Sequence, residues 1–191
     1  MISWSVDSVV NLQIIKYPDA RLKQVSVPVE SFDTELHRFI AELEKTMRAG
    51  PGGVGIAAPQ VGYFQRIVIV DISGMRKLPA DSSNNGCMIL INPEIIEWNG
   101  MDMGREGCMS VPDFTGNVIR AEEIAFTAFD TQGTQHELNS AGYEARAVQH
   151  EVDHLDGLLF LDRLVSRRTD LFKRKVYKQK IISSLPRPGE S

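Results

Sequence analysis

The stretch His150-Glu151-Val152-Asp153-His154 carries the most specific signal in this 191-residue sequence. We expect it to lie in a helix that has Ser140 as its N-cap, runs to about Leu155 and ends at Gly157. Side chains four residues apart share one helical face, so both imidazoles can reach one metal ion while Glu151 contacts water beside it. The alternative is a pair of surface histidines beside two solvated acids. The chain has only four histidines, so two at this spacing with the glutamate in place favour the metal site.

Two histidines do not complete such a site, because a catalytic zinc-type centre usually has three protein ligands and an open position for water. The third ligand is not evident downstream. Phe160 stands where a metzincin has a histidine, and the only later glutamate is Glu190. We therefore expect it upstream, where the candidates are Cys108, Cys87, His37 and His136, with acids such as Glu106 less favoured.

Cys108 has the most suitable surroundings among these candidates. Gly107 beside it lets the backbone approach an ion closely, and a thiolate outcompetes other ligand types for borderline-soft metals. Cys87 precedes an apolar strand and is more simply explained as a small hydrophobe, while we expect His37 and His136 to face solvent.

The rest of the chain predicts an α+β fold with no internal repeat and no dividing linker. A helix over 33–49 has an apolar face of Leu36, Phe39, Ile40, Leu43 and Met47. Strands are expected over 66–72, 88–98, 122–130 and 134–138, a polar loop over 73–86 and a last helix over 166–180. Residues 54–60 are too rich in glycine and alanine for a packed strand centre. The strands mostly follow one another, which favours α+β over alternating βαβ.

Composition and charge exclude several classes of protein. Hydrophobic residues make up 42% and charged residues 24%, as in globular domains rather than disordered chains or fibres. No apolar run approaches the roughly 20 residues of a membrane-spanning helix, and the N-terminus lacks the basic flank of a signal peptide. Two cysteines are too few for a disulfide scaffold, which favours a reducing compartment. Residues 163–180 hold eight basic residues and one acid in an otherwise acidic chain.

Three segments together resemble the motifs of the peptide deformylase family, in the family's order. They are Gly53-Val-Gly-Ile-Ala-Ala-Pro-Gln60, Glu106-Gly-Cys-Met-Ser110 and Gln149-His-Glu-Val-Asp-His154. The resemblance extends to 17–22 and to the region of 111–120, so it covers nearly the whole chain. It implies one catalytic domain over 1–191, with 182–191 as a flexible tail. Mixed, mostly antiparallel sheets are expected around a central HExxH helix, with an N-terminal and a C-terminal helix.

The resemblance also implies a reaction and a metal. The family removes the formyl group from the N-terminal formylmethionine of nascent polypeptides and releases formate. It implies Cys108, His150 and His154 as ligands of one divalent ion, usually Fe(II) in the cell. Spacing alone indicates zinc. Besides Fe(II), the alternatives for the same site are Zn(II), Ni(II) and Co(II).

The expected mechanism is metal-assisted hydrolysis of an amide. Glu151 accepts a proton from water and later delivers it to the leaving amine. By resemblance, the Gln60 side-chain amide and the Met109 backbone N–H donate to the oxyanion, where one donor is typically worth about 2.7–4 kcal/mol. Without the motif, Gln60 is better explained as an ordinary surface residue. Glu106 is expected to orient a ligand or the glycine-rich loop.

The resemblance assigns substrate contacts as well. Gly55 matches a position whose backbone pairs with the peptide as an added strand. Arg120 is expected at the outer end of the pocket for the methionine side chain. The other matching pocket positions are Val54, Tyr143, Ala147 and part of Arg146, and the apolar residues of this helix equally fit a plain core.

Two departures from the family pattern lie near Cys108. Met109 stands where leucine is common, which costs little because the required donor is backbone. Asp113 stands where glycine is common, which leaves the shape of that segment open.

The basic segment 163–180 resembles a C-terminal helix that docks on the ribosome, and its charge suits ribosomal RNA phosphates. The alternative is a solvated amphipathic helix. We expect no membrane partner and a bacterial cytoplasmic location, a mature organellar form being less favoured.

Two other functions compete with deformylation as explanations of these residues. A zincin-type endopeptidase is disfavoured by the absent downstream ligand. An inactive homologue that serves as a binding module on the ribosome is disfavoured because Glu151, the metal ligands and Gln60 are all present.

Overall fold

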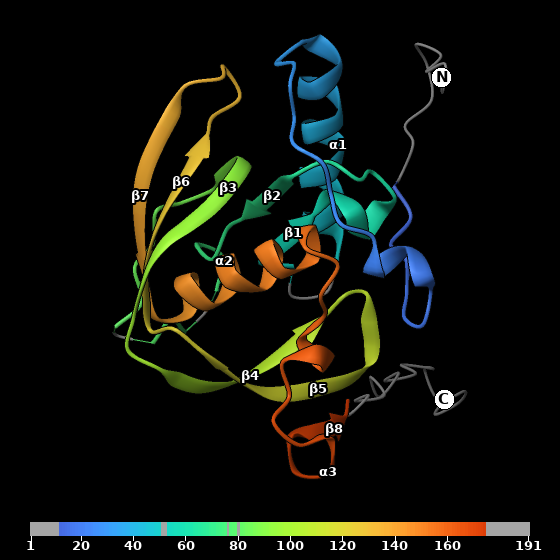
Figure 1. The fold of residues 1–191 in the computed structure, drawn as a ribbon, viewed down its shortest axis with the longest axis vertical. Helices are drawn as coiled ribbons and strands as arrows, with labels where there is room; N and C mark the ends of the chain where they lie inside the picture. Colours follow the sequence, from blue (N-terminus) through green and yellow to red (C-terminus); the bar gives the residue numbers. More distant parts are fainter. Residues whose placement is uncertain (1–11, 51–52, 76, 80, 175–191) are drawn as a thin grey trace, which may run out of the picture.

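The computed structural model describes residues 12–50, 53–75, 77–79 and 81–174, and its strands form two sheets (Figure 1). The first has the order β1-β2-β3-β6-β7, with β1 at Gly55–Ala57, β2 at Ile67–Val70, β3 at Met88–Asn99, β6 at Glu123–Phe129 and β7 at Gln135–Ala141. The second has the order β4-β5-β8, with β4 at Asp102–Cys108, β5 at Val111–Arg120 and β8 at Leu171–Lys173. All neighbouring strands in the two sheets pair antiparallel.

Three α-helices and three 3₁₀ turns complete the described chain. The helices are α1 (Thr34–Ala49), α2 (Gly142–Leu155) and α3 (Arg167–Asp170), and the turns are η1 (Ala20–Lys23), η2 (Ala58–Val61) and η3 (Phe160–Asp162). Within these described residues, none of the helices combines the length and apolar character that a membrane crossing requires. The mostly antiparallel α+β class predicted from the sequence is confirmed.

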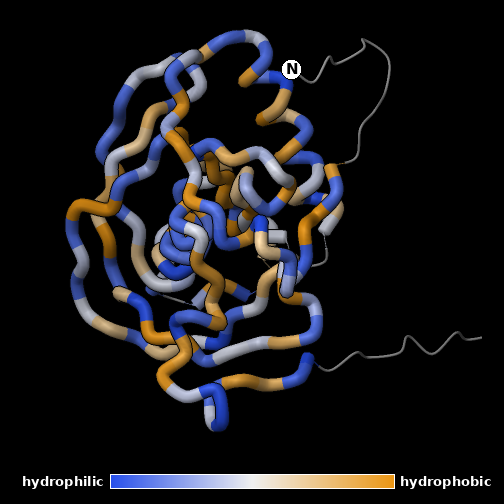
Figure 2. The backbone as a smooth tube through the Cα atoms, turned by 45° about the vertical axis from the view of Figure 1, so that its right-hand side comes forward, coloured by the Kyte–Doolittle hydropathy of each residue, from blue (hydrophilic) through white to orange (hydrophobic). Residues whose placement is uncertain are grey.

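The helix α2 lies between the two sheets (Figure 1). Its residues Ala145 and Val148 are fully buried against Val68, Val70 and Phe126 of the five-stranded sheet. Hydrophobic residues concentrate in the middle of the molecule, whereas the outer strands alternate between hydrophobic and hydrophilic residues (Figure 2). A helix enclosed in this way can hold polar side chains away from bulk water.

The opposite face of the five-stranded sheet is covered by α1. Ile67 and Ile69 of β2 alternate with the two valines of that strand and belong to a second core cluster, which includes the buried face of α1. The strand is therefore buried on both faces, as its continuous apolar run predicts. The helix begins where the Asp33 carboxylate accepts from the Leu36 N–H at 2.9 Å. The sequence prediction of this helix is confirmed.

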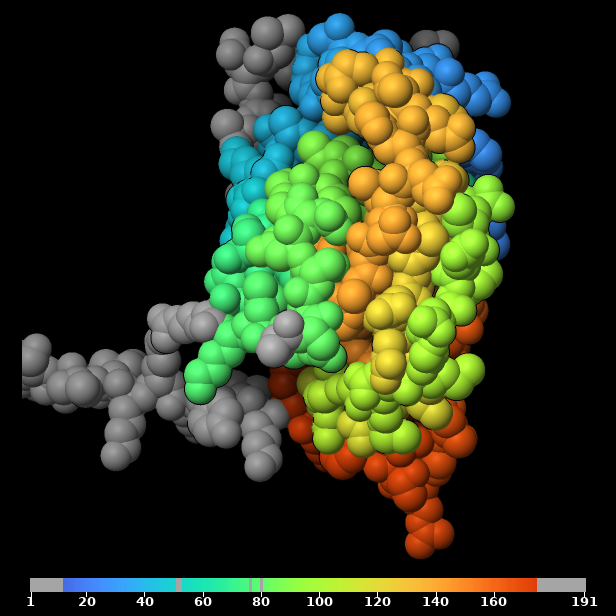
Figure 3. All heavy atoms as spheres, turned by 90° about the vertical axis from the view of Figure 1, so that its left-hand side faces the viewer, coloured from blue at the N-terminus to red at the C-terminus, as the bar shows by residue number. Residues whose placement is uncertain are grey.

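The described part of the loop 73–86 is held against the end of β7 and the start of α2 (Figure 3). The Ser83 N–H donates to the Ala141 carbonyl at 3.2 Å, and the Asn85 N–H donates to the Glu144 carboxylate at 2.7 Å. This anchoring fixes the first turn of the histidine-bearing helix.

Several sequence predictions need correction. Ser140 is not the N-cap of α2, because it still belongs to β7 and the helix starts after Ala141. The segment 54–60 does contain a strand, β1. It is short and lies at the edge of the five-stranded sheet, so its small residues are tolerated there. Strands β4 and β5 were not predicted at all.

The predicted helix over 166–180 is also wrong in its extent. Of the described residues in this range, only Arg167–Asp170 is helical, and the chain then pairs with β5 as β8. An available sheet edge outweighs helix propensity here, because tertiary pairing satisfies the backbone groups of this segment. Residues 175–180 and the expected tail over 182–191 lie outside the described residues.

Asn92 lies at a register shift in the middle of β3 and links it to the N-terminal arm. Its φ of 50° is left-handed, and its side chain accepts from the Val29 N–H at 2.8 Å and donates to the Val29 carbonyl at 2.9 Å. Asparagine tolerates this backbone conformation better than most residues. The Asn92-Pro93 interruption in the apolar pattern therefore marks a bulge rather than the end of the strand.

Asn92→Ala is expected to lower the free energy of unfolding by about 2–3 kcal/mol, from two lost hydrogen bonds and the left-handed backbone. Urea denaturation of the two proteins measures this difference. Asn139→Ala, at an exposed position of β7, is the control and should change stability by less than about 0.5 kcal/mol. Equal midpoints for wild type and Asn92→Ala would contradict the proposed link.

Candidate metal centre

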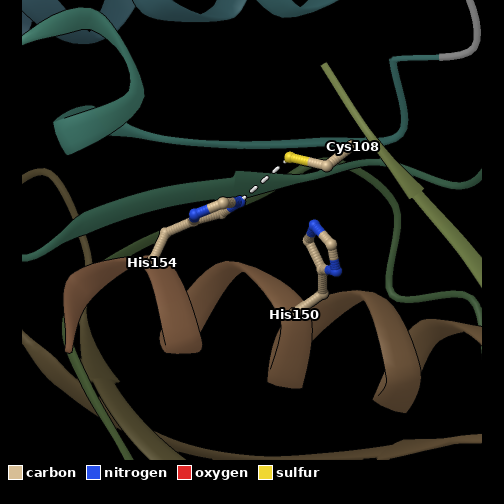
Figure 4. A group of neighbouring side chains, drawn as sticks. All are labelled: Cys108, His150 and His154. Atoms are coloured by element: carbon tan, nitrogen blue, oxygen red, sulfur yellow. Dashed lines mark hydrogen bonds between the residues drawn. The ribbon is translucent and has the colours of Figure 1, made fainter. Parts of the chain in front are cut away.

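Two histidines of α2 and one cysteine of β4 converge at the inner face of the helix (Figure 4). The candidate ligand atoms of Cys108, His150 and His154 all lie within 4.8 Å of one another, and all three residues are buried. The Cys108 Sγ lies 3.3 Å from His154 Nε2. One thiolate and two imidazoles form a donor set that suits a borderline-soft divalent ion.

The other candidates for the third ligand lie elsewhere. Cys87 is exposed, His37 Nε2 is 2.7 Å from the Thr131 carbonyl, and His136 Nε2 is 2.8 Å from Asp130. Among the upstream cysteines and histidines, the structure therefore brings Cys108 alone to the two histidines, whereas the acid Glu106 contacts only Nδ1 of His150.

Glu106 fixes the orientation of His150. Its Oε2 lies 2.9 Å from His150 Nδ1, so that Nε2 remains available toward Cys108. Arg120 and Arg146 also donate to this carboxylate. Burial alone raises the pKa of Glu106, but the hydrogen bonds from His150 and Arg120 outweigh it and hold the pKa well below its usual range. The carboxylate is therefore ionised.

Glu151 lies beside the cluster without joining it. Its side chain is buried, and its Oε2 has no hydrogen-bond partner among the residues that the structure describes. Burial raises the pKa of Glu151 to about 7. A Cβ on Gly55 would stand 2.5 Å from Glu151 Oε1, so glycine leaves the space that this carboxylate occupies. The unpaired oxygen and the three-donor set together fit an ion with water beside Glu151.

Gln60 is buried in η2 and is not a surface residue. Its Oε1 accepts from the Ala57 N–H at 2.8 Å, which directs the amide nitrogen toward the cluster. That nitrogen lies 3.1 Å from Ser110 Oγ and 3.4 Å from Cys108 Sγ. A hydrogen-bond donor is therefore fixed beside the cysteine.

A cavity of about 230 Å³ opens onto this cluster. Its lining includes the cysteine, His150, Glu151, Gln60 and Met109. The expected substrate positions Val54, Gly55, Glu106, Tyr143, Arg146 and Ala147 line the same cavity. The structure therefore brings together nearly all residues that the sequence singled out.

Arg120 is the exception, and its expected place at the outer end of the pocket is corrected. It does not line this cavity but lies behind Glu106, where its Nη1 donates to Asp153 at 2.5 Å. All three guanidinium nitrogens of Arg120 donate to carboxylates, so ion pairs hold the side chain away from this cavity.

Sequence reasoning missed two residues at the site. Ser110 is fully buried and accepts from Gln60; its only signal in the sequence is its place two residues after Cys108. Arg174 also lines the cavity, and no signal pointed to it because the segment was predicted as helix.

Comparison with known proteins gives one consistent result. The family model described as "Polypeptide deformylase" matches residues 11–170. A peptide deformylase of Alkalilimnicola ehrlichii is 41% identical over 167 residues, which cover 87% of this chain and 89% of that one. A peptide deformylase of Thermodesulfovibrio yellowstonii is 37% identical over 169 residues, covering 88% and 98% of the two chains.

Solved structures agree with the sequence relatives. The crystal structure of a peptide deformylase from Legionella pneumophila has a TM-score of 0.73 and 37% identity, covering 81% of this chain and 86% of that one. A Met-ala-ser-bound peptide deformylase from Acinetobacter baumannii has a TM-score of 0.73 and 35% identity, covering 82% and 100% of the two chains.

Cys108→Ala is expected to abolish retention of a divalent ion, because two histidines alone leave the three-donor set incomplete. Metal content per chain, measured by elemental analysis after gel filtration, should fall from about one to near zero. Cys87→Ala removes the other cysteine, which is exposed, and should leave metal content unchanged. Circular dichroism confirms that both variants are folded. Unchanged metal in folded Cys108→Ala would remove this residue from the ligand set.

Proposed function

The chain belongs to the polypeptide deformylase family, and from this premise we propose how its own residues carry out the family's reaction. Members of the family are metal-dependent hydrolases that remove the N-formyl group from formylmethionine of nascent polypeptides. The observation that carries the assignment of roles is the convergence of Cys108, His150 and His154 beside the buried carboxylate of Glu151. We assign residues 1–191 to one catalytic domain.

The metal is held by Cys108 Sγ and by the two histidines of α2. His150 uses Nε2, because its Nδ1 is engaged with Glu106. A divalent ion in this site supplies Lewis-acid polarisation and lowers the pKa of water toward neutrality. Fe(II) is the proposed physiological ion; Zn(II), Ni(II) and Co(II) suit the same donors.

Glu151 is the general base and then the general acid. Its carboxylate takes a proton from the attacking water and returns it to the leaving amine. The absence of a described donor at Oε2 supports this role, because the oxygen is left available for a proton. Gly55 supports it as well, because any side chain there would displace the carboxylate.

The Gln60 amide and the Met109 backbone N–H stabilise the oxyanion that forms from the formyl oxygen. Gln60 is preorganised for this task, since the Ala57 N–H fixes its carbonyl oxygen. Such fixed donors lower the barrier because they need no reorganisation during the reaction.

The substrate is proposed to enter the cavity with its methionine side chain against Val54, Tyr143, Ala147 and the aliphatic part of Arg146. Gly55 pairs with the peptide backbone as an added strand. The Acinetobacter baumannii structure with Met-ala-ser bound supports a tripeptide of this kind as a ligand.

The protein is further proposed to work in the bacterial cytoplasm and to dock on the ribosome through its basic segment 163–180. Arg167 and Arg168 are exposed on α3 and make no ion pair among the described residues. Arg163 is engaged with Asp153 and is not available in the same way. Unpaired surface cations favour RNA phosphates through release of counterions.

Anaerobic release of formate from formyl-Met-Ala-Ser tests the reaction and the metal together. We expect strong release from protein loaded with Fe(II) and weaker release with Zn(II). No release from folded, metal-loaded protein would favour the inactive homologue. Cleavage of unblocked peptides instead would favour an endopeptidase.

Glu151→Gln is the matched variant for this experiment, since it keeps the shape of the side chain but cannot accept the proton. It should retain about one metal ion per chain and lose about 10²–10⁴ in kcat. Normal turnover by this variant would show that another group is the base.

Ribosome docking predicts a loss on removing the exposed charges of α3. Arg167→Gln/Arg168→Gln should sediment with ribosomes several-fold more weakly than wild type, and the difference should shrink as salt rises. The control is Arg38→Gln/Lys45→Gln, which removes two exposed charges from α1. Equal sedimentation of all three proteins would contradict docking through this segment.

A further inference from the structure

The strand β8 carries Arg174 into the cavity of the metal centre. Phe172 pairs with Thr115 and Lys173 with Phe114, and the next N–H, that of Arg174, donates to the Asp113 carbonyl at 2.8 Å. The backbone at Asp113, where the family commonly has glycine, is therefore an ordinary part of β5, and its carbonyl accepts a hydrogen bond from the C-terminal segment. Arg174 therefore lies next to the end of β4, which carries Cys108, and it lines the same cavity as this cysteine.

The Arg174 guanidinium lies against the backbone of β4. A Cβ on Gly107 would stand 2.6 Å from Arg174 Nη2, so the group occupies the space that a side chain would fill. The Nη2 reaches the Cys108 carbonyl only at 3.5 Å. The Nε is buried and has no hydrogen-bond partner among the described residues. A buried N–H of a charged group costs free energy when it has no hydrogen-bond acceptor. This geometry therefore favours binding of a ligand that supplies an acceptor to Nε.

The neighbouring buried arginines differ from Arg174 in their partners. Arg120 pairs with Glu106 and Asp153, and Arg146 pairs with Glu106 and Asp102. Arg174 makes no ion pair with any carboxylate in the described ranges. Among the described residues the charge of Arg174 therefore has no carboxylate partner at the cavity, whereas the other two arginines are paired with carboxylates that hold the fold.

A second cationic side chain at the cavity, Arg105 of β4, packs against Phe172 of β8. The Arg105 guanidinium lies 3.5 Å above the ring of Phe172, and its Nη1 donates to Thr115 Oγ1 at 3.3 Å. It lines the cavity and likewise has no carboxylate partner in the described chain. Two guanidinium groups, Arg105 of β4 and Arg174 just after β8, therefore line the cavity without an ion pair among the described residues.

We propose that Arg174 is a specificity-determining residue that binds a side-chain carboxylate at the second or third position of the formylmethionyl peptide. This inference rests on the proposed function, since it assumes that the formyl group reacts at the metal cluster. A guanidinium matches a carboxylate with two parallel hydrogen bonds, which would satisfy the buried Nε. Arg105 adds charge of the same sign. Peptides with aspartate there should therefore be better substrates than their asparagine isosteres.

The test compares kcat/KM for formyl-Met-Xaa-Ala-amide and formyl-Met-Ala-Xaa-amide, with Asp, Asn or Lys as Xaa. The amide removes the terminal carboxylate, so only the side chain differs in charge. Wild type should prefer Asp over Asn about tenfold at one of the two positions, which corresponds to about 1.4 kcal/mol. Arg174→Gln should reduce this ratio to near one, and Arg174→Lys should restore part of it.

Lys173→Gln is the matched control, because it removes the same charge from the adjacent, exposed position of β8. It should keep the wild-type preference. The same Asp-to-Asn ratio in wild type and Arg174→Gln would overturn the proposal. So would a uniform gain on all peptides in Arg174→Gln, which would show that the guanidinium obstructs the cavity.

Two further results separate the remaining explanations. A preference that appears only with free-acid peptides would show that Arg174 binds a chain terminus, which overturns a preference among nascent chains. Failure of wild type to release formate from every peptide would instead refute the proposed function. The two failures are therefore distinguishable in one set of assays.

Discussion

The buried carboxylate of Glu106 is the constraint on which the rest of the site depends. It accepts from Arg120 of β5 and Arg146 of α2, and it lies 2.9 Å from His150 Nδ1. Because Glu106 itself belongs to β4, one charged group joins the histidine-bearing helix to two strands of the smaller sheet. Removing one partner of a buried ion pair typically costs about 3–5 kcal/mol, so these groups stabilise the arrangement only as a set.

The match between β4 and α2 follows from the spacing of two backbone structures. Residues two apart in a strand share a face and are separated by about 6.7 Å, and residues four apart in a helix are separated by about 6 Å. Glu106 Oε2 therefore lies 2.9 Å from Nδ1 of His150, and Cys108 Sγ lies 3.3 Å from Nε2 of His154. The carboxylate orients the first histidine, and the thiolate completes the donor set with the second.

Sequence reasoning succeeded where the signal is local. The spacing of the HEVDH stretch predicts a helix with two ligands on one face, and the apolar run at 66–72 predicts a strand buried on both sides. It failed where the partner is distant. The strand Leu171–Lys173 depends on an edge of β5 far upstream, and the position of Arg120 depends on carboxylates from two other elements. Residues alone left the third ligand open, because only the fold brings β4 to α2.

The glycines explain why the smaller sheet was not predicted. Gly104 and Gly107 give β4 the composition of a loop, yet neither has a positive φ. Their missing Cβ atoms leave space for functional side chains instead: a Cβ would stand 2.6 Å from Arg146 Cζ at the first position and 2.6 Å from Arg174 Nη2 at the second. Gly55 does the same for Glu151. Glycine is required at these positions because side chains from other elements fill the space of a Cβ atom. The sequence alone does not reveal this requirement, since those elements are distant in the chain.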